Sequence, residues 1–223
     1  MDVTARARAL GACHLFSGVA EPELVGLATQ AQLHRYRRGQ LVFCEGDRSD
    51  SLLVVAEGSL KVTSSRADGG ELLLAVVRPY KTIGELTVAD GGPRSASVSV
   101  VHDAAVLHIP REAVLAAAAN SPILTRALLG ALAALVRRLT ESAGDLAFLD
   151  IPRRVAKLVL SGAGPGGYVT TPLNQAELAA AVGASRQSLN AALQDFQRRG
   201  WLIVRPGKIE LTDPGALRRF AGE

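Results

Sequence analysis

The sequence is poor in cysteine, and this shortage limits the chemistry that the chain can support. Only two of the 223 residues are cysteines, Cys13 and Cys44, and they form no CxxC pair. An iron–sulfur cluster held by this chain alone would need about four ligands, which argues against an oxygen-sensing cluster. So few thiols are typical of a protein of the reducing cytoplasm, in which we expect both cysteines to be buried.

Metal sites and membrane spans also lack their usual signals. The four histidines include no His-x-His and no His-x-x-x-His pair, so no metal site is expected. No apolar run approaches the roughly 18 residues of a membrane span. Residues 1–6 have no apolar core of the signal-peptide type. We therefore expect a cytoplasmic protein with no metal and no membrane partner.

The charge that is present is unevenly distributed. The first 149 residues carry 15 Lys and Arg against 15 Asp and Glu, whereas the rest of the chain carries 10 against 6. The whole excess of +4 thus lies in the last third. A basic excess confined to one region indicates a nucleic-acid partner.

Between residues 36 and 109 the sequence has the pattern of a β-rich domain. Residues 5–32 indicate short helices before it, the last over residues 21–33. Short β-branched runs broken by Gly and Asp then occur at residues 40–44, 51–56, 59–64, 71–77, 95–101 and 105–109. Residues 66–70 indicate a hairpin loop. Several short strands at regular spacing predict a barrel or a double-sheet roll.

Residues 84–96 combine residue types that suit a phosphorylated ligand. Gly84 permits close approach, and a helix that starts there would offer free N–H groups to an anion. Arg94 could bind the same anion through two parallel N–H bonds, while Glu85 could accept from a ribose hydroxyl. Ser95 adds a hydroxyl and an N–H. From these residues alone, the alternative is a surface Arg–Glu pair beside a turn.

A long helix is predicted from Pro122 to about residue 149. Its apolar positions alternate four and three apart, with one serine among them: Leu128, Leu132, Leu135, Leu139, Ser142, Leu146 and Leu149. This heptad seam favours a parallel homodimer, and the alternative is one amphipathic helix packed on the roll. Asp150-Ile151-Pro152 ends the helix and predicts a hinge, followed by a helix over residues 153–160 and a glycine-rich loop over residues 162–167.

Residues 175–196 have the pattern of a helix-turn-helix. Ala179 is small where the two helices would cross, Gly183 lies in the turn, and Ser185 would cap the second helix. The outward positions suited to DNA contact are Arg186, Gln187, Asn190 and Gln194, with Gln175 at the first position of the motif. Residues 201–204 and 209–211 predict a hairpin wing whose Arg205 and Lys208 suit phosphates. The alternative is a pair of packed helices with no role in DNA binding.

Two of these motifs together resemble a known family. Gly84-Glu85-Leu86 followed by Arg94-Ser95-Ala96 resembles the phosphate-binding cassette of the cyclic-nucleotide-binding fold. The turns and inward apolar residues of that fold match Gly39, Phe43, Glu45-Gly46-Asp47, Val55, Glu57-Gly58 and Val62. With the helix-turn-helix, the resemblance covers nearly the whole chain, and it is to the bacterial cyclic AMP receptor (Crp–Fnr) family of transcription regulators.

The resemblance implies an α+β architecture with three parts. These are a cyclic-nucleotide-binding β-roll over residues 1–120, a dimerisation helix and hinge over 121–150, and a winged helix-turn-helix over 151–223. It implies a non-enzymatic homodimer that binds double-stranded DNA, with RNA polymerase as a further candidate partner. The ligand would be cyclic AMP, cyclic GMP or a cyclic dinucleotide, bound by Gly84, Glu85, Leu86, Arg94, Ser95 and Ala96, and it would set DNA affinity allosterically.

The sequence departs from the family at both sites. In the cyclic AMP receptors a Thr and the following Ser on the long helix bond the adenine, and the matching residues here are Leu139 and Thr140. After Arg186 the family usually has Glu, yet this chain has Gln187, and Ala191 stands where Arg or Lys is common. We therefore expect cyclic AMP to be a weak switch and the DNA half-site to differ beside its guanine.

Two alternative functions stay open from the sequence. The roll could be a structural dimerisation module that binds no ligand. It could also be a cupin-type enzyme fused to a helix-turn-helix, although the missing His-x-His motif counts against this hypothesis.

Overall fold

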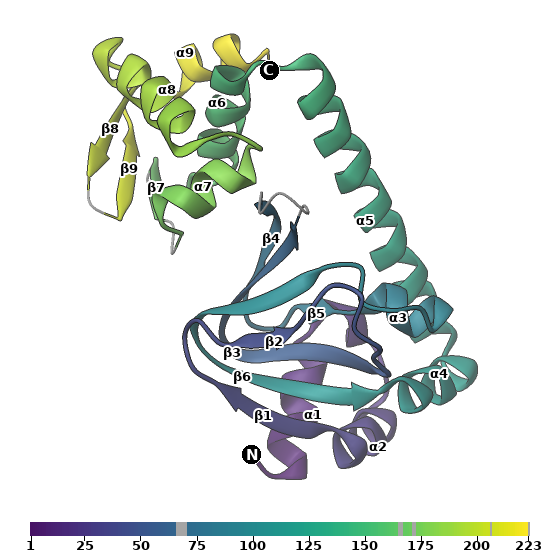
Figure 1. Cartoon of the computed structure of the whole chain (residues 1–223). Coiled ribbons are helices and arrows are strands. Elements are labelled where there is room, and N and C mark those ends of the chain that lie inside the picture. The colour runs from purple at the N-terminus through teal and green to yellow at the C-terminus, as the bar shows by residue number, and fades with distance from the viewer. Residues whose placement is uncertain (66–70, 165–166, 171–172, 206, 223) are drawn as a thin grey trace. The chain divides into compact units, whose positions relative to one another are not determined.

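The computed structural model describes residues 1–65, 71–164, 167–170, 173–205 and 207–222 (Figure 1). The described chain divides into two compact units. The first contains residues 1–65 and 75–138, and the second contains residues 71–74 and the chain from Leu139 onward. The hairpin loop expected at residues 66–70 lies outside the described residues.

A six-stranded antiparallel sheet is the framework of the first unit. Its strands are β1 (Gln32–Tyr36), β2 (Leu41–Phe43), β3 (Ser51–Ser65), β4 (Glu71–Val77), β5 (Thr82–Ile83) and β6 (Ser97–Pro110). The order is β1-β6-β3-β4, while β2 pairs with β6 and β5 pairs with β3. The roll predicted from the strand spacing is therefore confirmed.

The two long strands differ from the four short ones expected in their place. Residues 51–56 and 59–64 form one strand, β3. The runs expected at 95–101 and 105–109 form one strand, β6, which starts at Ser97, two residues later than expected. The break predicted between the two runs of β3, at Glu57-Gly58, is a series of register shifts in the pairing of β3 with β6. Gly58 has a φ of +81°, and a Cβ there would lie 2.2 Å from the Asp103 carbonyl oxygen. The glycine thus marks a bulge where two backbones meet, rather than a strand end.

Both faces of β3 are buried over residues 52–56, which explains the continuous apolar run there. Leu52 and Val54 face a core that also contains Leu107 and Ile109 of β6. Leu53 and Val55 face the opposite core inside the roll, with Val106. Because side chains alternate across a strand, a strand covered on both sides must be apolar at every position.

Helices cover the first of these cores. They are α1 (Val3–Gly11), the short 3₁₀ helix η1 (His14–Phe16), α2 (Glu21–Gln30) and α4 (Arg111–Asn120). The helix expected at 21–33 ends at Gln30, since residues 32–36 pair with β6 as β1. Pairing with a long neighbouring strand overrides the local helical pattern here. The strands β1 and β5 were not expected from the sequence.

The long helix α5 (Pro122–Phe148) follows the predicted bounds to within one residue (Figure 1). Its first turns pack on the core under α2 and α4, through the buried Leu124 and the half-buried Ala127 and Leu128. Farther along, Leu139 is 48% exposed and Leu146 is 46% exposed. No described helix is long and apolar enough to cross a membrane.

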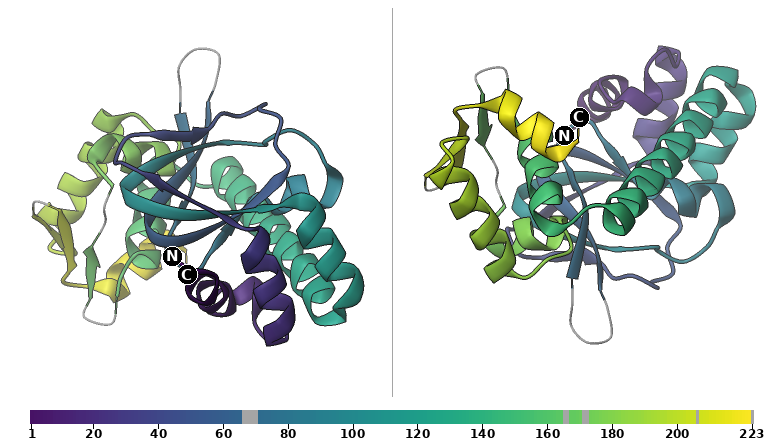
Figure 2. Two further views of the ribbon diagram at one scale, coloured as in Figure 1. Left: turned by 90° about the horizontal axis from the view of Figure 1, so that it is seen from below. Right: turned by 90° about the horizontal axis from the view of Figure 1, so that it is seen from above.

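The second unit is a small helical domain with a three-stranded sheet (Figure 2). Its elements after α5 are α6 (Ile151–Ser161), β7 (Tyr168–Thr170), α7 (Gln175–Ala181), α8 (Arg186–Arg198), β8 (Leu202–Arg205), β9 (Lys208–Leu211) and α9 (Pro214–Ala221). The sheet order is β7-β9-β8. Phe196, Leu189, Leu202 and Leu217 are buried in its core. The strand β7 was missed because glycines dominate the segment before it.

One expectation about the cysteines is wrong. Cys13 is buried, as expected, but Cys44 is exposed. Cys44 directly follows β2 in a turn, where its backbone N–H donates to Asp47 Oδ2 at 2.8 Å, and it belongs to neither core of the first unit.

Candidate functional site

The start of the helix α3 (Glu85–Asp90) is shaped by a glycine that contacts an arginine. Gly84 is the N-cap and has a φ of +101°. A Cβ at this position would lie 2.2 Å from Nη1 of Arg94 and 3.2 Å from the carbonyl oxygen of Ser51. The fold therefore brings Gly84 and Arg94 together, as the sequence predicted, and leaves no room for a side chain between them.

Arg94 is buried without enough partners for its guanidinium group. Arg94 is only 4% exposed. Nη2 donates to the Ser51 carbonyl oxygen at 2.9 Å, and the guanidinium carbon lies 4.2 Å from the centre of the Phe43 ring. Within the described chain, Nε and Nη1 are buried and have no hydrogen-bond partner. Unsatisfied buried donors on a cation are costly, and an anion would satisfy them.

Burial and nearby carboxylates shift the pKa of Arg94 in opposite directions. Burial lowers the pKa of Arg94, while the carboxylates of Asp50, Glu85 and Asp47 raise it. These carboxylates compensate part of the cost of burying the charge. None of them forms an ion pair with Arg94 in the described residues, so the guanidinium stays available to a ligand.

The backbone around Arg94 is fixed by the turn after β2. The Arg94 N–H donates to the Asp47 carbonyl oxygen at 2.9 Å, and the Gly46 N–H donates to the Arg94 carbonyl oxygen at 2.8 Å. Glu85 accepts a short hydrogen bond from the Thr82 hydroxyl through Oε1. Ala96 is buried, whereas Ser95 and Leu86 are exposed.

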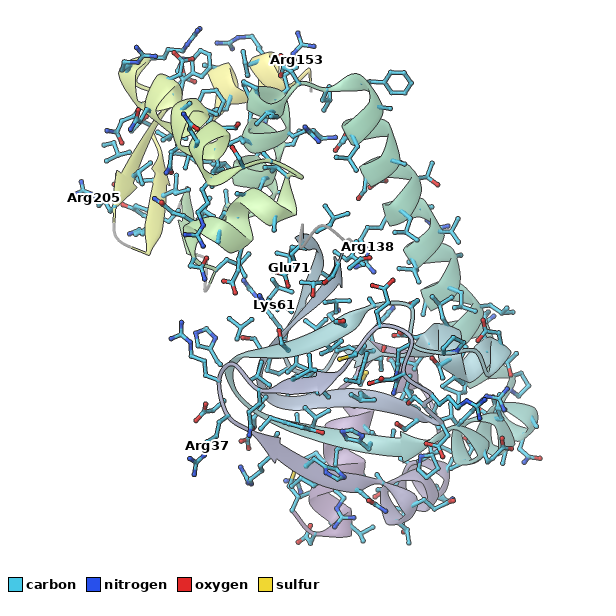
Figure 3. The ribbon with its side chains drawn as sticks, viewed as in Figure 1. Arg37, Lys61, Glu71, Arg138, Arg153 and Arg205 are labelled. Atoms are coloured by element: carbon cyan, nitrogen blue, oxygen red, sulfur yellow. The ribbon has the colours of Figure 1, made fainter. Side chains whose placement is uncertain are left out.

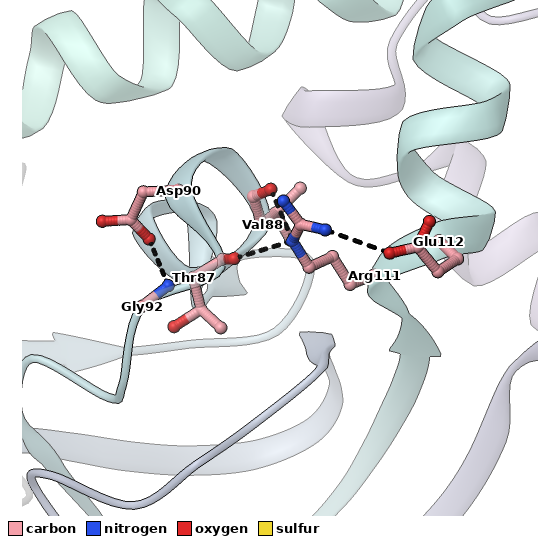
Figure 4. A network of polar contacts seen from close by, with 6 residues as sticks. All are labelled: Thr87, Val88, Asp90, Gly92, Arg111 and Glu112. Carbon is pink, nitrogen blue, oxygen red and sulfur yellow. Dashed lines mark hydrogen bonds and ion pairs between the residues drawn. The ribbon is translucent and has the colours of Figure 1, made fainter.

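The far end of α3 is held by an arginine that the sequence reasoning missed (Figure 4). Nε of Arg111 donates to the carbonyl oxygens of Thr87 and Val88, each at 3.1 Å. Asp90 Oδ1 accepts from the Gly92 N–H at 2.8 Å. A cation at the carbonyl end of a helix is favourable. Arg111 starts α4, and nothing in its sequence neighbourhood marks it as a partner of residues 87–88.

Three rings from β1 and β6 gather in the first unit. The Tyr36 hydroxyl lies 3.1 Å from Nε2 of His108, and the His34 and His108 ring centres are 4.5 Å apart. Burial, with His34 and Arg94 nearby, lowers the pKa of His108 from 6.5 to about 4. Among the described residues, no group of three or more His, Cys, Asp or Glu side chains could hold a metal ion.

The two residues expected at the nucleobase lie on the C-terminal half of α5. Leu139 and Thr140 are both exposed and belong to the second unit. The cassette belongs to the first unit, and the role of Leu139 and Thr140 in base recognition stays a prediction.

The helix-turn-helix forms as its pattern predicted. Ala179 is buried, and its carbonyl oxygen accepts from the Ala184 N–H at 3.0 Å across the turn. Gly183, in that turn, has a φ of +61°. Ser185 is the N-cap of α8, with its hydroxyl oxygen accepting from the Ser188 N–H at 3.1 Å.

The predicted DNA-contacting residues of α8 fall into two groups. Arg186, Gln187 and Gln194 are exposed. Asn190 is half-buried, and its Nδ2 donates to Oε1 of Gln175, the first residue of α7, at 3.3 Å. The first three side chains are thus open to solvent, whereas Asn190 is hydrogen-bonded to another residue of the motif.

The hairpin wing carries its two basic residues as expected. Arg205 projects from the hairpin (Figure 3) and lies 3.6 Å from the carboxylate of Glu210. Lys208 Nζ lies 3.3 Å from the centre of the Tyr168 ring, a cation–π contact. Tyr168 was missed because β7 itself was not predicted.

Comparisons with known proteins match both halves of the chain. A model of the cyclic nucleotide-binding domain matches residues 33–121, and a model of the Crp-like helix-turn-helix domain matches residues 153–220. A CRP-like cAMP-activated global transcriptional regulator of Mycobacterium tuberculosis is 36% identical over 93% of this chain and 96% of its own. The cyclic AMP receptor protein of Thermus thermophilus is 32% identical, over 93% of this chain and 96% of its own.

A solved structure agrees with these relatives. The crystal structure of the Thermus thermophilus catabolite activator protein is 30% identical, with a TM-score of 0.55 over 94% of this chain and 98% of that one. The similarity therefore spans both the roll and the helix-turn-helix, rather than one domain of a differently built protein.

The lowered pKa of His108 predicts acid sensitivity of the roll. His108 is neutral when folded down to about pH 4, but it gains a proton near pH 6.5 when unfolded. Its contribution to stability is therefore fully present above pH 6.5 and is lost as the pH falls toward 4. The wild type should therefore lose unfolding free energy between pH 6.5 and pH 4. In His108→Gln this loss should be smaller by up to about 2–3 kcal/mol.

The measurement is urea unfolding followed by circular dichroism at several pH values between 4 and 7. The control is His14→Gln, which removes an exposed histidine and should keep the wild-type pH dependence. Equal pH dependence in the His108→Gln variant and the wild type would contradict the assignment.

Proposed function

The chain belongs to the Crp family of transcription regulators, and we propose that its roll binds a cyclic nucleotide that sets the DNA affinity of its helix-turn-helix. The observation that supports this most directly is the buried guanidinium of Arg94, with Nε and Nη1 unpartnered beside Gly84. Phosphate oxygens only accept hydrogen bonds, and they can satisfy unpartnered N–H groups of an arginine. Because no carboxylate of the described residues bonds these nitrogens, they are available to a phosphate.

The cassette residues would each contribute to this ligand. Arg94 binds the phosphate, and Ser95 adds its hydroxyl and N–H. Glu85 uses the carboxylate oxygen not bonded to Thr82 to accept from a ribose hydroxyl. The small residues Gly84 and Ala96 allow the ligand to approach the backbone, and the exposed Leu86 offers it an apolar contact. We propose cyclic AMP, cyclic GMP or a cyclic dinucleotide as the class of ligand.

The helix α8 would enter the major groove of DNA. Arg186 reads a guanine through a bidentate contact, while Gln187, Asn190 and Gln194 face the neighbouring bases. Arg205 and Lys208 of the wing contact phosphates. A homodimer formed along α5 would place two such helices one DNA turn apart, roughly 34 Å, on a two-fold site.

Ligand and DNA would be coupled through the dimer helix and the hinge. The ligand must bind the DNA-competent state more tightly, because equal affinity for both states would shift no population. We further propose RNA polymerase as a partner, a cytoplasmic location and no enzymatic activity. The division at residues 120 and 150 into roll, dimerisation helix and DNA-binding domain is part of this proposal.

We predict that Arg94→Leu lowers the affinity for the cyclic nucleotide by roughly 10–150-fold, since a charge-assisted buried contact contributes about 1.5–3 kcal/mol. Calorimetric titration measures this affinity. The matched control is Arg48→Leu, which removes an exposed arginine from the loop between β2 and β3 and should bind as the wild type does. Unchanged binding of every tested nucleotide by Arg94→Leu would show that the phosphate lies elsewhere.

The second prediction concerns the DNA half-site. A glutamine offers a donor and an acceptor that match adenine, whereas the glutamate usual in the family accepts from cytosine. Selection from random DNA should therefore return the family's guanine opposite Arg186, with adenine or no preference beside it. Recovery of the unaltered family consensus at full stringency would contradict the role of Gln187.

The third prediction is that cyclic AMP raises DNA affinity by less than about a hundredfold, equivalent to roughly 2.7 kcal/mol of coupling. Leu139 cannot hydrogen-bond an adenine, and it extends the apolar seam that packs the dimer without ligand. DNA affinity with and without saturating cyclic AMP measures the coupling. Leu139→Thr restores a hydroxyl and should increase the coupling by roughly 2–12-fold. A hundredfold effect in the wild type would contradict this prediction.

A further inference from the structure

An amide–amide hydrogen bond joins the two helices of the helix-turn-helix. Asn190 Nδ2 donates to Gln175 Oε1 at 3.3 Å. Gln175 is the first residue of α7 and is exposed, whereas Asn190 lies in the second turn of α8 and is half-buried. Asn190 follows Arg186 by four residues, so both lie on the same face of α8.

The backbone on both sides of this bond is fixed by caps. At the start of α7, Asn174 Oδ1 accepts from the N–H groups of Ala176 and Glu177, and the Asn174 N–H donates to Glu177 Oε2 at 2.9 Å. At the start of α8, Ser185 caps the helix through Ser188. Gln175 and Asn190 therefore meet on a rigid frame.

The bond leaves each amide with the groups that DNA recognition needs. Asn190 uses one of its two N–H donors to bond Gln175, so the other donor and the acceptor Oδ1 can still bond a base. One donor and one acceptor are what an adenine requires at N7 and N6 in the major groove. Gln175 keeps both N–H donors of its Nε2, which suit a backbone phosphate because phosphate oxygens only accept.

We propose that Gln175 and Asn190 act as one unit, in which a DNA phosphate orients Gln175 and Gln175 orients Asn190 to read an adenine. The phosphate holds Nε2 of Gln175 toward the DNA and hence Oε1 toward Asn190. Because Oε1 can only accept, Asn190 must direct an N–H toward it, and its amide is held in the orientation that matches adenine. Gln175 is thus a positioning residue, and the proposal rests on the proposed function.

Gln187 provides an internal comparison. It lies one residue after Arg186 and is exposed, and it makes no side-chain hydrogen bond in the described part of the chain. An amide without such a partner can rotate between orientations and accept more than one base. Discrimination should therefore be sharper at the base pair read by Asn190 than at the one read by Gln187.

The test is a double-mutant cycle on DNA sites selected by the full-length wild type. Affinity is measured for the selected site and for each single base-pair replacement. Asn190→Ala should lose roughly 5–150-fold of discrimination at one A·T pair. Gln175→Ala should lose discrimination at the same pair and also weaken binding to every sequence. The double variant should discriminate no worse than Asn190→Ala alone, because the two residues act as a unit.

Gln175→Glu separates the two roles of Gln175. A carboxylate accepts through both oxygens, so the variant would present an acceptor to Asn190 without a phosphate to orient it, but it would repel the phosphate. Overall affinity should therefore fall while discrimination at the A·T pair is retained. Gln30→Ala, a matching change at an exposed position of α2, should leave both quantities unchanged. Circular dichroism confirms that each variant is folded.

The outcomes distinguish this inference from the proposed function. Additive losses in the double variant, or losses at different base pairs, would overturn the coupling between Gln175 and Asn190 while leaving DNA binding intact. A wild type that selects no DNA sequence would overturn the proposed function and this inference with it.

Discussion

The contact between Arg94 and Gly84 is the constraint on which the ligand site depends. A guanidinium group lies buried with two unpartnered nitrogens, and a Cβ at Gly84 would lie 2.2 Å from one of them. The turn at Gly46 and Asp47 fixes the arginine backbone, while Arg111 secures the far end of α3. Phe43 of β2, Ser51 of β3 and Gly84 before α3 thus surround one cationic group whose burial is costly unless an anion is bound.

The DNA-binding unit follows a different principle, because its functional side chains are exposed on a frame stabilised by caps and a small core. Asn174, Ser185 and Asp150 each cap a helix, and Phe196 packs against Trp201 and Phe220. Such a frame keeps α8 rigid while Arg186 and Gln187 stay open to solvent. The ligand site needs burial to strengthen its electrostatics, whereas the DNA site needs exposure and a fixed orientation.

The sequence allowed the prediction of features that depend on local chemistry. The Ser185 cap, the turn glycine Gly183, the bounds of α5 and the approach of Gly84 to Arg94 all follow from residue type and spacing. Long-range pairing could not be predicted: β1 forms because residues 32–36 meet β6, and Glu57-Gly58 is a bulge because Asp103 lies opposite. The partners Arg111, Tyr168 and His108 were missed for the same reason, since each acts on a residue distant in sequence or on an unexpected strand.

The central claim is that the unpartnered nitrogens of Arg94 bind the phosphate of a cyclic nucleotide. The most direct test is calorimetry of the ligand-free protein against a panel of cyclic mono- and dinucleotides, each paired with the matching nucleoside that lacks phosphate. The claim predicts saturable binding of at least one cyclic nucleotide, with little or no binding of its nucleoside. Equal binding of nucleotide and nucleoside, or no binding across the whole panel, would contradict it.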